Sequence, residues 1–350
     1  MSKHKQLILN IIFRLAAIAA AFLFTVVIIA AIQAQPLEAY KNILLGSLGS
    51  TKKIGEVIRA WLPLVIVTSG LMITYTAGLW NIGVEGQITM GAIFTTALLR
   101  FLQDSALSPI LIVILSILAG ASGGMLWAGL AGLLKIYGGI NEIFAGLGLN
   151  FVADAFTLWL IFGPWKRPGV GSMSGTIPFK ESLRLPTLPG SPVSIWPLLL
   201  AMLLVGIIYI LLRNSYFGLR LKAIGKNTRA AFLKGIPTAR YMVGAFLICG
   251  LCAGLAGAIQ VTGVHFRLVP SIASGYGFLG MLVAMLVNFH VVWALPVAFV
   301  FSTLNTGSIQ LPMVMKLDAS LAGVLQGSLV LFVLLMEGVR KKVMTRIEED

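Results

Sequence analysis

One long uncharged stretch, residues 105–134, strongly constrains the fold of this chain. Over these 30 residues there is no Asp, Glu, Lys or Arg. An α-helix crosses the hydrocarbon core of a bilayer in about 20 apolar residues. Lipid offers no hydrogen-bond partner to the backbone, so a crossing segment must be helical or part of a closed barrel. The stretch therefore predicts a membrane-spanning helix that ends before Lys135.

The composition extends this prediction to the whole chain. Of the 350 residues, 58% are hydrophobic and 11% are charged, whereas soluble proteins average about 25% charged residues. We therefore expect an all-α integral membrane protein. A net charge of +14 would suggest nucleic acid as the partner of a soluble chain. In a membrane protein, cytoplasmic loops and anionic lipid explain the excess of Lys and Arg, so no nucleic-acid partner is expected.

Apolar runs predict about ten transmembrane helices. The first is too long for the roughly 7–15 apolar residues of a signal peptide, so we expect it to be retained. The loop after it opens with Pro36 and carries Lys41. The expected spans are residues 15–32, 57–79, 86–99, 105–134, 138–162, 195–212, 241–262, 275–288, 291–307 and 319–336.

Ten crossings put both termini on one side of the membrane. Placing the N-terminus, Lys135, residues 213–240 and the C-terminal tail in the cytoplasm collects 15 of the 26 Lys and Arg residues there. Five spans per half imply that any internal repeat is inverted, a common plan of transporters with broken helices near the centre. We expect one permease domain with halves at about 1–190 and 191–340, in which residues 164–192 form a loop. Residues 86–99 would then correspond to the span after residues 274–280.

Residues 78–92 contain the most informative polar group. Asn81, Glu85 and Gln87 lie among four glycines, with apolar sequence on both sides. Polar side chains at membrane depth usually face a protein interior or a watery path, and glycine allows the helix to break there. One interpretation places the three residues along a substrate path. The other is a tight polar turn between two ordinary membrane helices, in which the glycines serve packing alone. A structural role for Glu85 is also open, in which it accepts the freed N–H groups of a broken backbone.

The fifth span carries a second polar group. Asn141 and Glu142 lie at its expected cytoplasmic entrance. Their role there as a gate, as a helix cap or as a substrate contact is left undecided by the sequence. Asn150 is nine residues further along, roughly 13 Å into the helix. We expect Asn150 to face the interior of the protein.

Residues 213–240 have a different character. They hold seven basic residues and no acid. Asn227 or Thr228 can cap a short helix at 229–234, and Gly235 with Pro237 ends it. Small side chains at Ala230, Ala231 and Gly235 suit insertion into a groove of another protein. The alternative is a basic helix that lies on anionic lipid.

Three motifs together carry a family resemblance. NIGVEGQ at residues 81–87, GGINEI at 138–143 and FGLRLKAIGKNTRAAFLKGI at 217–236 resemble the permease subunits of nucleoside and simple-sugar ABC importers. The resemblance covers nearly the whole chain, and NIGVEGQ favours the nucleoside branch over related sugar and branched-chain amino-acid permeases. Arg229 stands where the Glu-Ala-Ala loop of other ABC permeases has its glutamate.

This resemblance implies partners and roles. The partners are ABC ATPase subunits, a second permease that is identical or different, and an extracytoplasmic substrate-binding protein, in the plasma (inner) membrane of a prokaryote. The chain would bind no cofactor, and ATP would be used by partner subunits. The substrate-path candidates are Asn81, Glu85, Gln87, Asn141, Glu142 and Asn150. The ATPase-coupling candidates are Asn227, Arg229, Ala230, Ala231, Gly235 and Ile236.

Other functions find less support in the sequence. Gly225-Lys226-Asn227 lacks the earlier glycine and the final Ser or Thr of a phosphate-binding loop. The three histidines have no metal-ligand spacing, and Cys249 and Cys252 suit buried packing. A membrane-embedded enzyme would want a catalytic cluster. An ion-coupled secondary transporter would need intramembrane acids, which Glu85, Glu142 and Asp154 could supply.

Overall fold

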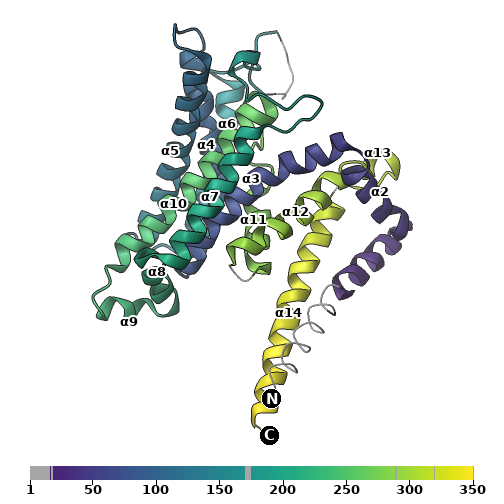
Figure 1. The fold of residues 1–350 in the computed structure, drawn as a ribbon, viewed down its shortest axis with the longest axis vertical. Helices are drawn as coiled ribbons and strands as arrows, with labels where there is room; N and C mark the ends of the chain where they lie inside the picture. Colours follow the sequence, from purple (N-terminus) through teal and green to yellow (C-terminus); the bar gives the residue numbers. More distant parts are fainter. Residues whose placement is uncertain (1–15, 17–18, 170–174, 288–289, 319, 350) are drawn as a thin grey trace. The chain divides into compact units, whose positions relative to one another are not determined.

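A computed structural model describes residues 16, 19–169, 175–287, 290–318 and 320–349. The secondary structure of these residues is helical, and no strand occurs among them (Figure 1). This confirms the all-α prediction for the described part of the chain. The basic N-terminus with Lys3, Lys5 and Arg14 lies outside the described residues, as do Asn288 and Ala319 at the ends of two expected spans.

Six helical segments are long and apolar enough to cross a membrane. They are α3 (Thr51–Thr76), α5 (Pro109–Ile136), α6 (Glu142–Phe162), α7 (Ile195–Asn214), α10 with its π-helical end (Thr238–His265), and α12 with α13 (Val291–Val314). A seventh crossing is possible if Ala19–Ala31 and α2 (Pro36–Leu48) are one span bent by 111°. Length and composition thus support six or seven spans among the described residues, fewer than the expected ten.

Three further helices lie within expected spans but are not among these six or seven. α4 (Val84–Leu102) and α11 (Tyr276–Leu286) follow the two glycine-containing segments that we expected to correspond. α14 (Leu321–Glu349) has an apolar part at Leu321–Met336. α4 is 19 residues long and α11 is 11.

The prediction of a loop after the first span is wrong, because α2 occupies it. Pro36 stands in the first turn of this helix, where its missing N–H costs nothing. Ala39 and Ile43 are buried on one side of α2. An apolar face four residues apart therefore overrides the loop signal of Pro36 and Lys41.

The chain divides into two compact units, Met1–Val57 with Phe299–Asp350, and Ile58–Ala298. The described core of the first unit contains Ile29 and Ile43 packed with Leu311. In the same unit the Gln326 side chain donates to the carbonyl oxygen of Phe301 at 2.9 Å.

Close helix packing in the second unit depends on glycine. A Cβ added to Gly124 of α5 would lie 2.6 Å from the Cα of Gly254 in α10, and one added to Gly91 of α4 would collide with the same glycine. Without a strong hydrophobic drive between helices in lipid, such close backbone contact supplies the packing energy. The three helices therefore form the tightly packed centre of this unit.

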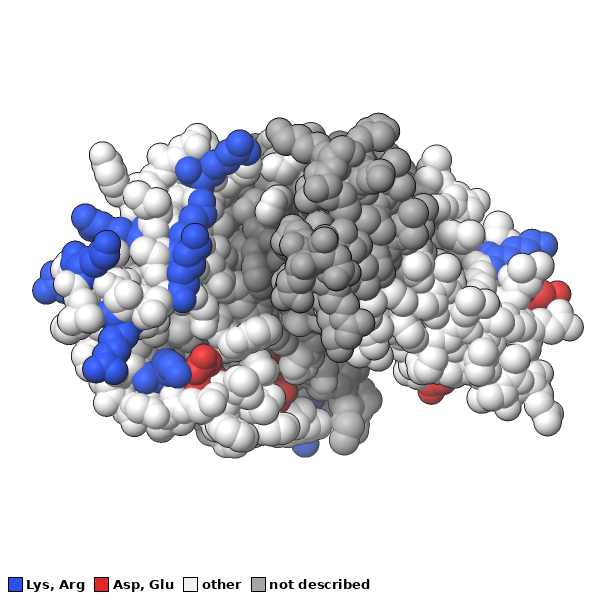
Figure 2. Space-filling model, turned by 90° about the horizontal axis from the view of Figure 1, so that it is seen from below, with Lys and Arg blue, Asp and Glu red and all other residues white. Residues whose placement is uncertain are grey.

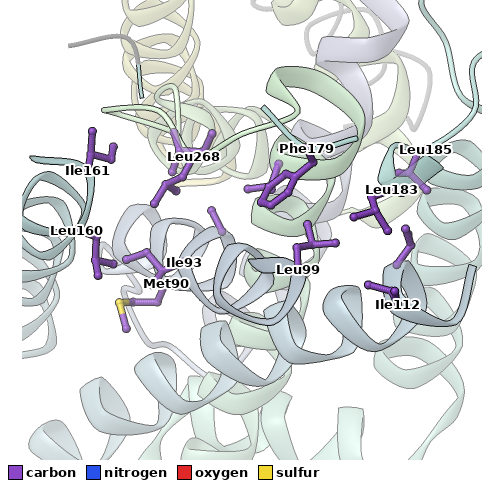
Figure 3. Packing of buried hydrophobic residues seen from close by; sticks show 14 of the residues in the cluster. Met90, Ile93, Leu99, Ile112, Leu160, Ile161, Phe179, Leu183, Leu185 and Leu268 are labelled. Carbon is purple, nitrogen blue, oxygen red and sulfur yellow. The ribbon is translucent and has the colours of Figure 1, made fainter. Parts of the chain in front are cut away.

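The α6–α7 connection belongs to the second unit. Phe179, Leu183 and Leu185 are buried in one apolar cluster with Ile93 and Leu99 of α4 (Figure 3). The backbone N–H of Phe179 also donates to the Phe266 carbonyl at 2.9 Å. The connection is thus packed onto the helices.

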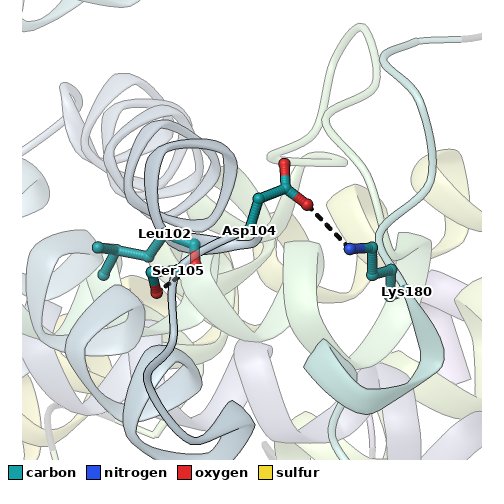
Figure 4. A network of polar contacts seen from close by, with 4 residues as sticks. All are labelled: Leu102, Asp104, Ser105 and Lys180. Atoms are coloured by element: carbon teal, nitrogen blue, oxygen red, sulfur yellow. Dashed lines mark hydrogen bonds and ion pairs between the residues drawn. The ribbon is translucent and has the colours of Figure 1, made fainter.

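One ion pair ties this connection to the end of α4. Lys180 Nζ lies 2.9 Å from Asp104 Oδ1, next to the turn closed by Ser105 (Figure 4). Both side chains are largely exposed. An exposed ion pair contributes about 0–1 kcal/mol to the stability of a protein. The buried apolar cluster is therefore the main contact that holds the connection in place.

Candidate functional site

The polar stretch around residue 81 is a break between two helices. α3 ends at Thr76, Gly78 follows with φ +74°, and α4 begins at Val84. A positive φ is open to glycine without steric cost. The predicted glycine-broken helix is therefore present at residues 77–83.

Asn81 and Gln87 are paired with each other across this break. Asn81 Nδ2 donates to Gln87 Oε1 at 3.0 Å, and Gln87 Nε2 donates to Asn81 Oδ1 at 2.9 Å. Asn81 Nδ2 also lies 3.1 Å from Cys249 Sγ of α10. Both amides are buried, with 1% and 0% of their surface exposed. The pair therefore fixes the start of α4 against its own preceding loop and against α10.

Glu85 joins this break to a second one, which lies between the π-helical end of α10 at His265 and the start of α11 at Tyr276. Its Oε1 accepts the backbone N–H groups of Gly277 at 2.9 Å and Phe278 at 3.2 Å, in the first turn of α11. α11 begins after Gly275, which has φ +76°. A helix N-terminus has unpaired N–H groups and a favourable dipole for an anion. Glu85 thus satisfies freed backbone groups, but those of α11 and not of its own helix.

Asn150 completes the polar contacts at the start of α4. Its Oδ1 accepts the N–H of Gly86 at 2.8 Å, and its Nδ2 donates to the carbonyl of Ile82 at 3.0 Å. Only 6% of the residue is exposed. Asn150 therefore lies in the interior of the second unit and connects α6 to the break.

Asn141 and Glu142 lie at the turn between α5 and α6, and the Glu142 carboxylate also accepts the backbone N–H of Trp80, the residue before Asn81. The Asn141 side chain accepts the N–H of Ile143 at 2.9 Å and caps α6. Glu142 Oε2 lies 2.6 Å from Lys135 Nζ at the end of α5. The structure thus brings Asn81, Glu85, Gln87 and Asn150 together and places Asn141 and Glu142 at a helix end.

The basic segment after α7 folds into two short helices. α8 covers Tyr216–Lys226, which the sequence did not predict, and α9 covers Thr228–Leu233. The Asn227 side chain accepts the N–H of Ala230 at 2.9 Å, so Asn227, and not Thr228, is the cap of α9. Gly235 has φ +79°, the left-handed conformation typical of a residue that ends a helix.

The exposed face of α9 differs from the expected one. Ala231 is buried, with 5% of its surface exposed, whereas Phe232 is 65% exposed and Leu233 is 78% exposed. Ala230, Arg229 and Gly235 are exposed, and Ile236 is half-buried. The segment therefore offers two large apolar side chains, which the sequence analysis missed, and Ala231 packs against its own chain.

Basic side chains surround α9. Figure 2 shows Lys and Arg gathered on one face of the molecule, and Arg213, Arg220, Lys222, Lys226, Arg229, Lys234 and Arg240 are all exposed. A cavity of about 820 Å³ lies beside them, with Arg213, Lys222 and Lys226 in its lining together with Tyr75 and Trp293. In Figure 1 this end of α7 and α10 lies away from the α6–α7 connection. An acidic or anionic surface would be attracted to it.

The end of α8 packs on the helix break. A Cβ added to Gly225 would collide with the Thr76 carbonyl and lie 3.2 Å from the Gly78 nitrogen. Backbone therefore touches backbone between the basic segment and the stretch that carries Asn81.

The described part of the chain contains no set of side chains that could bind a metal ion. No group of three or more His, Cys, Asp or Glu side chains is close enough there to hold a metal ion. Cys249 and Cys252 are free and buried.

Comparison with known proteins shows which permeases this chain is similar to. The chain is 27% identical to the glucose ABC transporter permease protein TsgB13 of Haloferax volcanii, over 89% of this chain and 83% of that protein. It is 26% identical to the nucleoside ABC transporter permease protein NupB of Lactococcus lactis (84% and 82% covered). It is 27% identical to the guanosine ABC transporter permease protein NupP of Bacillus subtilis (85% and 85%). Residues 53–334 match the family described as the branched-chain amino acid transport system permease component, and the chain therefore belongs to this family of multi-pass membrane permeases.

Proposed function

We propose that the chain is the translocation subunit of an ATP-driven importer of nucleosides, with simple sugars as the alternative cargo. The observation that carries this proposal is the end-to-end similarity to nucleoside, guanosine and glucose permeases, which covers more than four fifths of each chain. Both cargo classes are small and rich in hydroxyl groups, so one polar path serves either.

The membrane architecture follows from the helices. Counting α4, α11 and the apolar part of α14 with the long spans and the bent pair gives ten crossings. The contact between Glu85 at the start of α4 and the start of α11 supports two inverted halves whose broken helices meet near the centre. Both termini and the basic face then lie in the cytoplasm, in the plasma (inner) membrane of a prokaryote.

The partners follow from the exposed surfaces. An ABC ATPase subunit seats α9 in a groove, with Phe232 and Leu233 as the inserted side chains and the basic residues around them attracting its surface. The α6–α7 connection at the opposite end contacts an extracytoplasmic substrate-binding protein, and a second permease, identical or different, completes the path. The ATPase subunits hydrolyse ATP, and this chain needs no cofactor.

Four polar residues position the backbone that borders the substrate path: Asn81, Glu85, Gln87 and Asn150. Their polar atoms are used by each other and by the starts of α4 and α11. They therefore shape the path by fixing two helix starts. Asn141 and Glu142, at the α5–α6 turn, act at the cytoplasmic mouth.

Uptake by the reconstituted complex tests the proposal. The permease is placed in proteoliposomes with its ATPase and second permease subunits, and binding protein loaded with labelled guanosine or glucose is added outside. We expect uptake that requires ATP in the lumen and continues after ionophores collapse the ion gradients. Uptake that needs no ATP and stops with the ionophore would instead identify an ion-coupled secondary transporter.

A further inference from the structure

Asp154 has an unusual position for a charged residue. It lies twelve residues after the first residue of α6 and eight before the last, about 18 Å and about 12 Å along the helix from its ends. Its side chain is exposed. Phe151, Val152 and Trp159 are also exposed on α6 and all are apolar. A carboxylate thus stands near the middle of a membrane span, on the surface of the chain.

The surroundings of Asp154 point toward the two helix breaks. The carboxylate lies near the hydroxyl of Thr89 in α4 and interacts with the charge of Glu85. Thr89 is 1% exposed, and apart from this carboxylate its hydroxyl has no hydrogen-bond partner among the described residues. Asp154 is therefore at the edge of the exposed face of α6, next to the start of α4.

Lipid cannot be the neighbour of this carboxylate at low cost. Acids within membrane spans face a protein interior or water, and neither lipid tails nor the apolar neighbours on α6 can pair with it. A second copy of the chain offers no cation at this depth either. No Lys or Arg occurs in residues 105–134, 142–162, 195–212, 241–264 or 275–308. A water-filled path can supply the polar neighbours that this carboxylate needs.

We propose that Asp154 faces the water-filled translocation path and accepts hydrogen bonds from two neighbouring hydroxyl groups of the solute, such as the vicinal diol of ribose or a hexose. This inference rests on the proposed function. An ionised carboxylate is an acceptor only, with two oxygens, and its hydrogen bonds are charge-assisted. Phe151, one turn away and 73% exposed, offers an apolar surface to the ring of the base or sugar.

Thiol labelling tests the placement without any transport assay. Asp154→Cys and the control Val152→Cys are made in the assembled complex in membranes. Val152 is 54% exposed but points about 200° away around the helix. We expect a charged, membrane-impermeant methanethiosulfonate to label position 154 and not position 152, because only position 154 faces water. Cys249 and Cys252 are buried, so the native cysteines should give little background labelling. A residue 154 that stays unlabelled, at rest and during ATP turnover, overturns the proposal.

Uptake of paired solutes tests the hydroxyl contact. In wild type and Asp154→Asn, maximal uptake rates are compared for a ribonucleoside and its 2′-deoxy analogue, which lacks one hydroxyl of the diol. We expect the ratio of the two rates to fall about tenfold in the variant, as for loss of one charge-assisted contact. The half-saturating concentration, set by the binding protein, stays unchanged. An equal loss for both solutes overturns the diol contact.

The two tests separate this inference from the proposed function. If wild type imports neither nucleosides nor sugars, the proposed cargo and the hydroxyl contact both fall. Selective labelling at position 154 would still establish that the residue faces water.

Discussion

Gly225 at the end of α8 lies directly against Gly78 in the break between α3 and α4. A Cβ added to Gly78 would lie 3.3 Å from the Cα of Gly225. Two residues after Gly225, Asn227 caps α9, and three residues after Gly78, Asn81 holds Gln87 of α4. A displacement of α9 by a partner therefore has a short backbone route to the broken helix.

The first prediction concerns this contact. Gly225→Ala places a methyl group against the Thr76 carbonyl, and we expect a loss of about 1–3 kcal/mol in stability, as for overpacked sites. ATP-dependent uptake should fall as well. Gly206→Ala in α7 is the control, because an added Cβ there meets nothing within 4 Å. Thermal unfolding in detergent and uptake measure both effects, and equal behaviour of the two variants would contradict the role of the contact.

A second prediction separates two acids. Glu85→Ala leaves the N–H groups of Gly277 and Phe278 without their acceptor, which should cost about 1–3 kcal/mol. Glu142→Ala removes the partner of the Lys135 ammonium and of the Trp80 backbone N–H, and we expect a smaller loss because Lys135, with 31% of its side chain exposed, can still contact water. The same thermal unfolding assay compares them. A larger loss for Glu142→Ala would refute the bridging role of Glu85.

The amide pair gives a third prediction. Asn81→Leu and Gln87→Leu each leave one buried amide without its reciprocal partner. In a double-mutant cycle we expect a coupling energy of about 0.5–3 kcal/mol, because the double variant has no amide left to satisfy. Additive effects would show that the pair contributes no mutual stabilisation.

A fourth prediction concerns the packed centre of the second unit. Gly124→Ala in α5 would bring its methyl group 2.6 Å from Gly254 of α10, so folding yield and thermal stability should drop. Gly148→Ala in α6 has open space around the new Cβ and should behave as wild type. Normal stability of Gly124→Ala would mean that α5 and α10 are not in backbone contact.

Local signals in the sequence predicted much of the structure. The sequence correctly predicted a glycine-containing break near Gly78 and the end of a short helix at Gly235, and Asn227 is one of the two caps that it allowed. These features depend on a few neighbouring residues, so the sequence alone defines them.

Features that depend on distant contacts were not predictable. The backbone N–H groups that donate to Glu85 lie in α11, almost two hundred residues away, and no local pattern reports that pairing. Ala231 is buried and Phe232 is exposed, which depends on the side of α9 that packs against the rest of the protein. A helix of six residues is too short for its sequence pattern to predict that side. Helix α2 was missed because Pro36 and Lys41 outweighed the spacing of Ala39 and Ile43.

The central claim is that motion from an ATPase subunit enters this permease through α9. The most direct measurement compares association with the ATPase subunit and ATP-dependent uptake for Phe232→Glu and for Phe101→Glu, an 81% exposed residue in the last turns of α4. The account predicts that Phe232→Glu inserts in the membrane but loses both association and uptake, while Phe101→Glu keeps both. Intact association and uptake in Phe232→Glu would contradict it and leave α9 as a basic helix on lipid.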